Sequence, residues 1–444
     1  MPRSLWIGAG AAPALAALSL LLPYQPVYDP WGWLVWGREL TRLDLATAQG
    51  MSWKPLPVLV DAPLSLLGSA APLGWLFLAR TGWLLAPLLA AWLAVRLAGE
   101  EIGRWRFVAA GLAAGSVALT ADAFTPATRQ FSGGLSEPLL VALVLGGVAA
   151  ALAGRSRLGL WLGFGAALLR PECWPFLAIG AVWASRREPH LRPHALAVAL
   201  LVPLAWFVPD LLGAGDPLAG SRTARGGPIE PLDAFPVLGR ALAAPLAAAW
   251  IGVALFLFRR GRSRADRALM LILVGAAAWI ALVAAMAVAG FAGLPRFLAP
   301  ATAAIAVVGG VGVARAGVAL GAGRHRFVAV ATSLALAAAA VQLGVRSAEV
   351  PADLRDVDRQ AMLVDGMFEL ATWVPSERLF YCGDRIRLAN LLTPPTALAW
   401  KLDRPLASVR TVAHPEYGVA LSTRYLPGER IAQIGRWRAT DLGC

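Results

Sequence analysis

The side chains best suited to chemistry in this chain are charged residues that border long apolar runs. Asp29 stands in the stretch YQPVYDPWGWLVWGREL (residues 24–40), after the first apolar run and among three tryptophans. A carboxylate in such a place could act as a general base. Ionisable residues at membrane depth are costly and are therefore candidates for a functional site. Others that border apolar runs or lie in nearby loops are Lys54, Glu137, Arg170, Glu172, Arg222 and Arg296.

The composition places the chain in a lipid bilayer. Hydrophobic residues make up 58% of the 444 residues, charged residues only 15%, and the mean hydropathy is +0.62. These values are too apolar for a soluble protein with one or two cores. The net charge of +13 is spread over short arginine clusters between apolar runs and forms no basic face. Nucleic acid is therefore not an expected partner.

Apolar windows of about 17 to 25 residues predict the membrane spans. They lie at 5–23, 73–97, 107–121, 138–154, 195–213, 237–258, 268–291, 297–314 and 327–345. Arginines flank both ends of one further apolar segment, which predicts a hairpin of two short spans, 158–169 and 173–184. Its apex would hold Arg170 and Glu172. The predicted fold class is a polytopic α-helical membrane protein with about eleven transmembrane helices.

The arginine clusters predict the orientation of the spans. Clusters at 104–106, 155–157, 186–192, 259–267 and 324–326 fall on one side, which is cytoplasmic by the positive-inside rule. The N-terminus is then cytoplasmic and the C-terminus extracytoplasmic. We interpret the first apolar run as a retained span and not as a cleaved signal peptide. Chemistry is expected on the outer face of the plasma membrane, where the candidate carboxylates lie.

The composition changes from about Arg346 onward, where charge rises and the long apolar runs stop. We therefore predict a transmembrane domain at 1–346 and a small soluble α/β domain at 347–444, outside the membrane. The elements expected in the second domain are an amphipathic helix at 351–374, a buried strand at 378–383, a proline-broken helix at 385–402, and strands at 417–424 and 430–440.

The three cysteines have different expected roles. Cys382 and Cys444 both fall in the predicted outer domain, where an oxidising exterior would allow them to pair and tie down the C-terminus. Two unpaired thiols are the alternative, because sequence alone does not give the distance between them. Cys173 falls within the predicted membrane layer and is expected to be a packing residue.

The order of these residues resembles the GT-C superfamily of polytopic glycosyltransferases, which includes protein O-mannosyltransferases and lipid A aminoarabinose transferases. Those enzymes place an acidic residue in the first outer loop, here Asp29, and a Lys-Pro pair late in that loop, here Lys54-Pro55. Further markers in the expected order are GGLSEPLL with Glu137, LLRPECWPF with Arg170 and Glu172, GAGDPLAGS with Asp216, and GLPRFLAP with Arg296. The resemblance covers 5–343. It departs from many members after Asp29, where Pro30 replaces a second acidic residue.

The resemblance implies transfer of a sugar from a polyprenyl-phosphate carrier to a hydroxyl group of a glycan, lipid or protein acceptor. Asp29 would act as the base, and a single displacement would invert the anomeric centre. Fixed cations in a poorly hydrated site would stabilise the leaving phosphate. The residues expected to bind substrate are Lys54, Glu137, Arg170, Glu172, Arg222 (or Arg225) and Arg296. Membrane lipids are the remaining expected partner.

Most of these residues also have a structural interpretation. Asp29 could be the N-cap of a helix that starts at Pro30, and Glu137 could belong to a similar helix start. Arg170 and Glu172 could simply pair across the hairpin apex.

Other charged and aromatic side chains could serve the membrane itself. Lys54 and Arg296 could extend to lipid headgroups. Arg80, inside the second predicted span, is expected to be paired internally or near a helix end. The tryptophans around 31–36 predict an interfacial helix on the outer leaflet, with its rings in lipid.

Cofactor patterns are weak in this sequence. It has no paired-cysteine motif, and its four histidines, His190, His194, His325 and His414, fall mostly on the predicted cytoplasmic side, so no metal is predicted with certainty. A divalent cation bound by Asp29 and Glu137 is an alternative. The sequence also has no G-x-x-x-x-G-K loop, which argues against ATP-driven transport.

Two other classes of protein remain as alternatives. A secondary transporter would be expected to show two related halves, and no such repeat is visible. A flippase for lipid-linked sugars, or a scaffold, would need no general base.

Overall fold

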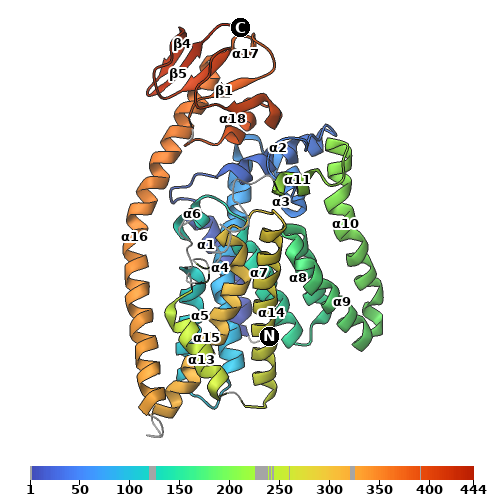
Figure 1. Cartoon of the computed structure of the whole chain (residues 1–444), viewed down its shortest axis with the longest axis vertical. Coiled ribbons are helices and arrows are strands. Elements are labelled where there is room, and N and C mark those ends of the chain that lie inside the picture. Colours follow the sequence, from blue (N-terminus) through green and yellow to red (C-terminus); the bar gives the residue numbers. More distant parts are fainter. Residues whose placement is uncertain are drawn as a thin grey trace.

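The computed structural model describes residues 3–119, 127–225, 239, 242, 245–259, 261–320, 326–390 and 392–444. It consists of a bundle of helices with a small β-sheet domain at one end, and the C-terminus lies in that domain (Figure 1). Parts of two predicted spans, 120–121 and most of 237–244, fall outside the described residues.

A helix lies over each of the predicted spans. These helices are α1 (Arg3–Ser19), α4 (Ala71–Ala98), α5 (Trp105–Ala118), α7 (Glu137–Leu152), α8 (Ser156–Leu169), α9 (Trp174–Arg187), α10 (Arg192–Ala214), α13 (Ala247–Arg259), α14 (Arg264–Val288), α15 (Ala299–Leu320) and α16 (Arg326–Trp373). Within the described residues, five stretches are long and apolar enough to cross a membrane: Gly68–Ala98, Pro189–Ala214, Arg264–Val288, Pro295–Val318 and Arg326–Trp373. The prediction of a helical polytopic protein is confirmed.

The predicted short hairpin is also present. α8 ends at Leu169, a single 3-10 turn η2 (Pro171–Cys173) follows, and α9 begins at Trp174. Arg170 and Glu172 therefore lie at the apex, as expected. Cys173 is a buried free thiol in the main hydrophobic core, which agrees with its expected packing role.

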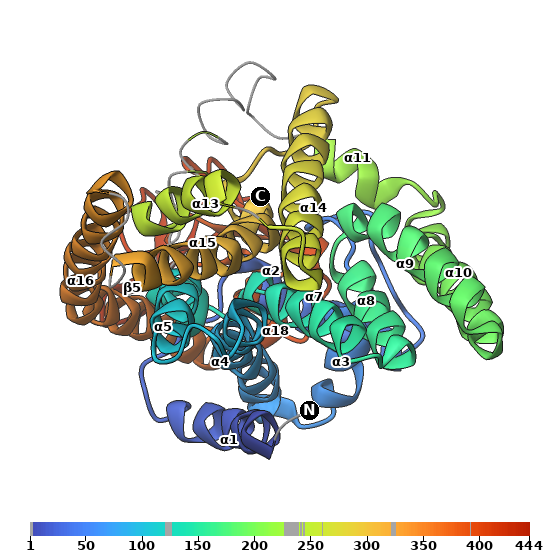
Figure 2. The ribbon, with the colours of Figure 1, turned by 90° about the horizontal axis from the view of Figure 1, so that it is seen from below.

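Helix α15 lies at the centre of the bundle, between α13, α5 and α14 (Figure 2). Its small residues allow the backbones of neighbouring helices to touch. A Cβ at Gly312 would lie 2.7 Å from the carbonyl carbon of Gly252, and one at Gly310 would lie 2.7 Å from the carbonyl oxygen of Ala109. Close packing of this kind holds helices together where lipid supplies no hydrophobic driving force.

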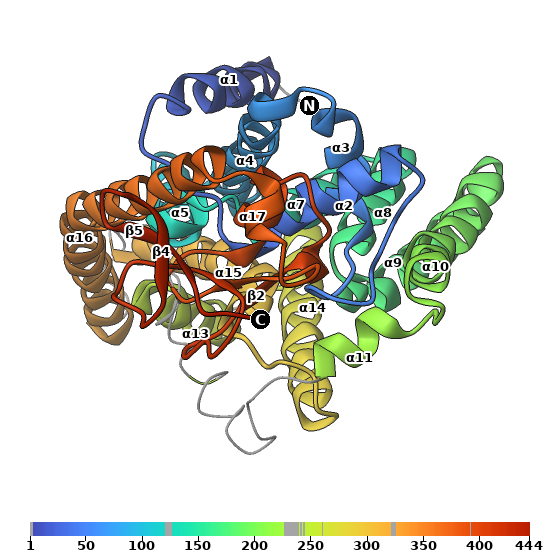
Figure 3. The same cartoon turned by 90° about the horizontal axis from the view of Figure 1, so that it is seen from above.

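Helices α10 and α16 lie at opposite edges of the bundle (Figures 2 and 3), and both carry exposed apolar side chains. The exposed ones include Leu196, Leu200, Leu204 and Leu212 on α10, and Phe327, Val330, Leu334 and Val341 on α16. Exposed apolar belts of this extent are expected on a surface covered by lipid. Arg80, by contrast, is fully buried in α4 and donates hydrogen bonds to the carbonyls of Ser19 and Phe131, so its internal pairing is confirmed.

Helix α2 (Tyr28–Thr41) carries the tryptophans of the first loop and lies directly below the C-terminal domain (Figure 1). Trp31, Trp33 and Trp36 are at most 5% exposed and belong to the same hydrophobic core as residues of that domain. The prediction that their rings lie in lipid is therefore wrong. Helix α18 (Pro395–Lys401) packs against α2 and covers the surface that lipid would have occupied.

The C-terminal domain is joined to the bundle by α16, which continues without a break through both the last predicted span and the predicted amphipathic helix. A short helix, α17 (Ser376–Leu379), and a turn occupy 378–383, so the strand predicted there is wrong. The helix predicted at 385–402 is also wrong in its first half, which forms β1 (Ile386–Leu388) before α18 begins.

The sheet of this domain is mixed, with the strand order β2-β1-β3-β5-β4. β1 runs parallel to β2 (Val409–Thr411) and to β3 (Val419–Ser422). β3, β5 (Trp437–Asp441) and β4 (Glu429–Ile434) are antiparallel. The strand predicted at 417–424 is confirmed. The single strand predicted at 430–440 is instead a hairpin of two strands, β4 and β5, which turns at Gly435.

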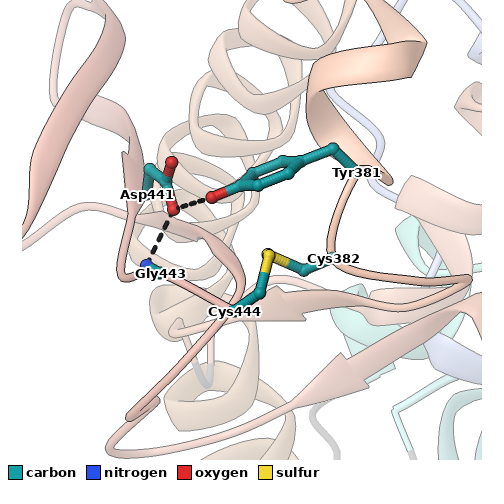
Figure 4. The surroundings of a disulfide bond; sticks show 5 residues. All are labelled: Tyr381, Cys382, Asp441, Gly443 and Cys444. Atoms are coloured by element: carbon teal, nitrogen blue, oxygen red, sulfur yellow. Dashed lines mark hydrogen bonds between the residues drawn. A yellow bond between two sulfur atoms is a disulfide. The ribbon is translucent and has the colours of Figure 1, made fainter.

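A disulfide joins Cys382 to Cys444, with a Cα–Cα distance of 5.3 Å (Figure 4). Asp441 lies beside it and accepts hydrogen bonds from the Tyr381 hydroxyl and, at 2.8 Å, from the backbone N–H of Gly443. Of the two alternatives, a disulfide and two unpaired thiols, the structure therefore contains the disulfide. The last residue of the chain is thereby tied to the turn that precedes β1.

We expect the disulfide to be formed in protein purified without reductant. Alkylation after unfolding should then modify one cysteine, Cys173, and all three only after reduction, as counted by intact mass. The bridge closes a separation of 62 residues, so its reduction should lower the free energy of unfolding by about 4 kcal/mol. Three alkylated cysteines without reductant would contradict the pairing.

Candidate active site

A cavity of about 510 Å³ lies among helix ends, next to the first turn of α2. Its walls come from the start of α2, the segment before α3 (Pro55–Ser65), the apex between α8 and α9, the ends of α10 and α14, α11 (Ala219–Arg225), and η4 (Pro295–Leu298). Trp174, Trp206, Phe207 and Phe297 form much of its apolar surface. A concave, mostly apolar cavity with a few charged groups is the usual form of a small-molecule site.

Asp29 lies in the first turn of α2 and lines this cavity. Its Oδ2 atom is 3.8 Å from Nζ of Lys54 and 3.7 Å from Nη2 of Arg296, and its side chain is 19% exposed. The helix begins at Tyr28 after Val27, whose side chain makes no capping hydrogen bond. Asp29 is therefore not the N-cap, and its carboxylate is directed to two cations.

Three further charged residues form a second, more deeply buried part of the same network. Nη2 of Arg170 donates a 2.7 Å hydrogen bond to Oε1 of Glu137, and its Nη1 lies 3.5 Å from Oε1 of Glu172. Nε of Arg296 is 3.5 Å from the same Glu137 oxygen, so Arg296 joins the two parts. The side chains of Glu137, Arg170 and Glu172 are 2%, 8% and 3% exposed.

Prolines explain why helix ends carry these groups to one place. The charged residues adjoin prolines at 29–30, 54–55, 137–138, 170–172 and 295–296. Proline is favoured at the start of a helix because its φ is already helical and it has no N–H to leave unpaired. In α3, α7, η2 and η4 the proline is at the first or second position. The prolines therefore place the starts of two helices and two 3-10 turns at the charged network.

Aromatic rings support two of the cations. The guanidinium carbon of Arg170 lies 3.5 Å from the ring centre of Phe297, and Nζ of Lys54 lies 5.0 Å from the ring centre of Trp33. Such contacts stabilise a partly desolvated cation. Burial nevertheless lowers the pKa of Lys54 below its ordinary value, and the nearby carboxylate of Glu137 offsets part of this effect.

The structure brings six of the seven predicted site residues together. The exception is Arg222 on α11, which is largely exposed and pairs with Asp216. Its neighbours Ser221 and Thr223 line the cavity, but Arg222 does not. Arg225, the alternative, lies over the ring of Phe291 at 4.6 Å.

The sequence analysis did not single out several residues of the cavity wall. Trp53 and Trp206 are held by hydrogen bonds from their indole nitrogens to the carbonyls of Ala205 and Ala167. Asp210 is 3% exposed and accepts a 2.7 Å hydrogen bond from the N–H of Gly220. A carboxylate inside an apolar helix is a signal that could have identified Asp210. Nothing in the sequence distinguished these tryptophans from the others.

A divalent cation shared by Asp29 and Glu137 is not favoured by this arrangement, because Arg296 lies against both carboxylates. Among the residues that the structure describes, no group of three or more His, Cys, Asp or Glu side chains could hold a metal ion.

The fold and site define a polytopic helical membrane protein with a cavity of buried ion pairs at one end of its bundle. Among solved structures, the chain is similar to ArnT from Cupriavidus metallidurans in the apo state, with a TM-score of 0.55, 15% sequence identity, and coverage of 99% of this chain and 98% of that one. The chain therefore has the fold of ArnT, and the resemblance expected from the sequence is confirmed at the level of the fold.

A second structure, ArnT from the same organism bound to undecaprenyl phosphate, matches with a TM-score of 0.47 and 15% identity over 91% of this chain and 85% of that one. No protein-family model and no curated protein sequence matches the chain.

Replacing Glu137 tests whether the buried network holds the helix ends together. Glu137→Gln leaves Arg170 without its closest carboxylate, and loss of one partner of a buried ion pair typically costs about 3–5 kcal/mol. We expect a clear fall in the melting temperature in detergent. Glu100→Gln, a change at an exposed residue, serves as the control. Equal melting temperatures for wild type and Glu137→Gln would contradict this account.

Proposed function

We propose that the protein is an inverting glycosyltransferase, which moves a sugar from a polyprenyl-phosphate carrier to an acceptor hydroxyl outside the membrane. The observation that carries the proposal is the ion-pair network, in which a carboxylate on the cavity wall faces two cations at helix starts. The fold shared with ArnT supports the GT-C class.

Lys54 and Arg296 are the residues we propose to hold the carrier phosphate. Both line the cavity, with side-chain nitrogens 3.8 and 3.7 Å from the Asp29 carboxylate. Arg170 lies in the more deeply buried part of the network, where it pairs with Glu137 at 2.7 Å and with Glu172. An anionic phosphate in this poorly hydrated site would gain from both cations and from the helix starts.

Asp29 is the proposed general base. The acceptor oxygen attacks the anomeric carbon while its proton moves to the Asp29 carboxylate. The bond between the anomeric carbon and the phosphate oxygen breaks, and its electron pair leaves with the carrier as a phosphate monoester. Because attack and departure occur on opposite faces in a single step, the configuration at the anomeric carbon is inverted.

The orientation in the plasma membrane follows from the same proposal. All eleven helices over the predicted spans would cross the bilayer, with the arginine clusters in the cytoplasm. The cavity and the domain at 347–444 would then lie outside, with 1–346 as the catalytic domain. The Cys382–Cys444 disulfide supports an oxidising location for the C-terminal domain.

Asp29→Asn tests the base. The variant keeps the shape of the side chain but cannot accept the proton, so the rate of sugar transfer from a panel of polyprenyl-phosphate sugars should fall about 10²- to 10⁴-fold. The control is Asp44→Asn, which changes an exposed carboxylate of the same loop region. Transfer would be followed by mass spectrometry of the lipid.

The outcomes separate the proposal from its rivals. Normal transfer by Asp29→Asn would contradict the proposal that Asp29 is the general base. Absence of transfer by wild type with every donor of the panel, together with movement of a lipid-linked sugar across vesicles, would favour a flippase or transporter.

The pH dependence of phosphate binding tests Lys54. Its pKa is lowered by burial, so the ammonium should lose its proton, and part of its attraction for phosphate, at a lower pH than an exposed lysine would. The affinity for undecaprenyl phosphate should therefore fall as pH rises through this lowered pKa. Lys54→Arg should remove the fall, because arginine stays charged. Binding would be measured by tryptophan fluorescence. Identical pH profiles for wild type and Lys54→Arg would contradict the proposed contact between Lys54 and the phosphate.

A further inference from the structure

The C-terminal domain contacts the helix that carries Asp29 at its first turn. Oγ1 of Thr396, in the first turn of α18, donates a 2.8 Å hydrogen bond to the carbonyl oxygen of Tyr28, the residue before Asp29. Thr396 is 2% exposed. A domain that is distant in sequence therefore binds the backbone one peptide away from the carboxylate.

The packing around this bond leaves little space for movement. A Cβ at Gly32, one turn after Asp29, would overlap the Met51 side chain and lie 3.4 Å from the methyl group of Thr396. Trp31 and Trp33, which flank Gly32, are buried in the core that α2 shares with the C-terminal domain. The first turn of α2 is thus enclosed on the side that faces α18.

The other end of α2 is fixed to the same domain. Arg38 is 8% exposed, and its two terminal nitrogens donate 3.0 Å hydrogen bonds to the carbonyls of Trp400 and Arg404. Its Nε lies 3.0 Å from Oδ1 of Asp403, which also pairs with Arg42 at 2.9 Å. With both ends bound, α2 cannot slide or rotate without breaking contacts to the domain.

We propose that Thr396 is a positioning residue for Asp29, so that the C-terminal domain is part of the active site and not only a cover over it. The inference rests on the proposed function. The N–H groups at the start of a helix have no partners within the helix, but the Thr396 hydroxyl donates to a carbonyl, so it adds a bond that comes from outside α2. Because this bond anchors the peptide next to Asp29, it fixes the direction of the Asp29 side chain relative to Lys54 and Arg296.

The contact should matter for rate more than for binding. Misplacement of a reacting group by about 1 Å can cost about 10²-fold in rate. The cations that we assign to the phosphate lie on other segments, before α3 and in η4, and the Thr396 hydrogen bond is made to neither of these segments. Loss of its hydroxyl should therefore lower kcat while KM for the lipid donor stays nearly constant.

The test compares Thr396→Val, Thr396→Ser and wild type in the same transfer assay. Valine keeps the shape and removes the donor, and we expect kcat to fall at least about tenfold with KM for the lipid donor within about twofold. Serine restores the donor and should recover most of the rate. Thr332→Val is the matched control, because it removes an equally buried hydroxyl that bonds only within α16.

Each outcome supports or overturns the inference. Wild-type kcat in Thr396→Val, or equal losses in the valine and serine variants, would overturn it. If Thr396→Val does not fold, Thr396→Ala, which only removes atoms, takes its place with the same expectations. Normal turnover of the Thr396 variants in an enzyme that Asp29→Asn inactivates would refute this inference alone, whereas no transfer by wild type would refute the proposed function.

Discussion

The constraint on which the rest of the structure depends is the burial of charge at the end of an apolar helix bundle. Removing an ion from water is costly unless other charges and hydrogen bonds surround it. Three carboxylates and three cations meet this requirement together: Asp29, Glu137, Glu172, Lys54, Arg170 and Arg296. Because they come from five separate segments, the network forms only when those helix ends converge.

The packing of the bundle makes that convergence possible. Glycines on α13 and α15 let backbones approach closely at the centre, and prolines begin the helix and the 3-10 turn that carry Glu137 and Arg296. The C-terminal domain completes the arrangement from the other side. Thr396 of α18 donates a hydrogen bond to the first turn of α2, and Arg38 of α2 donates one to the carbonyl of Trp400, so the helix that carries Asp29 is bound at both ends. The charged site therefore depends on contacts between regions that are far apart in the sequence.

Much of the fold could be predicted because length and hydropathy identify apolar helices, and because charges at their ends stand out. The short hairpin followed from that signal, and six of the seven residues proposed for the site do lie together in one ion-pair network. The environment of Trp31, Trp33 and Trp36 could not be predicted, because it depends on a domain more than three hundred residues later. Arg222 has a positive charge and lies in a segment that lines the cavity, but its side chain pairs with Asp216 and does not line the cavity. The direction of this side chain could not be predicted from the sequence. The short strand β1 gave no local signal because its partners are distant in sequence.

An experimental structure of the protein with undecaprenyl phosphate tests the central claim most directly. The account predicts that the phosphate lies within hydrogen-bond distance of Lys54 and Arg296, with the Asp29 carboxylate on the same cavity wall and Arg170 still paired with Glu137. A phosphate bound away from this network, or an Asp29 side chain directed out of the cavity, would contradict it.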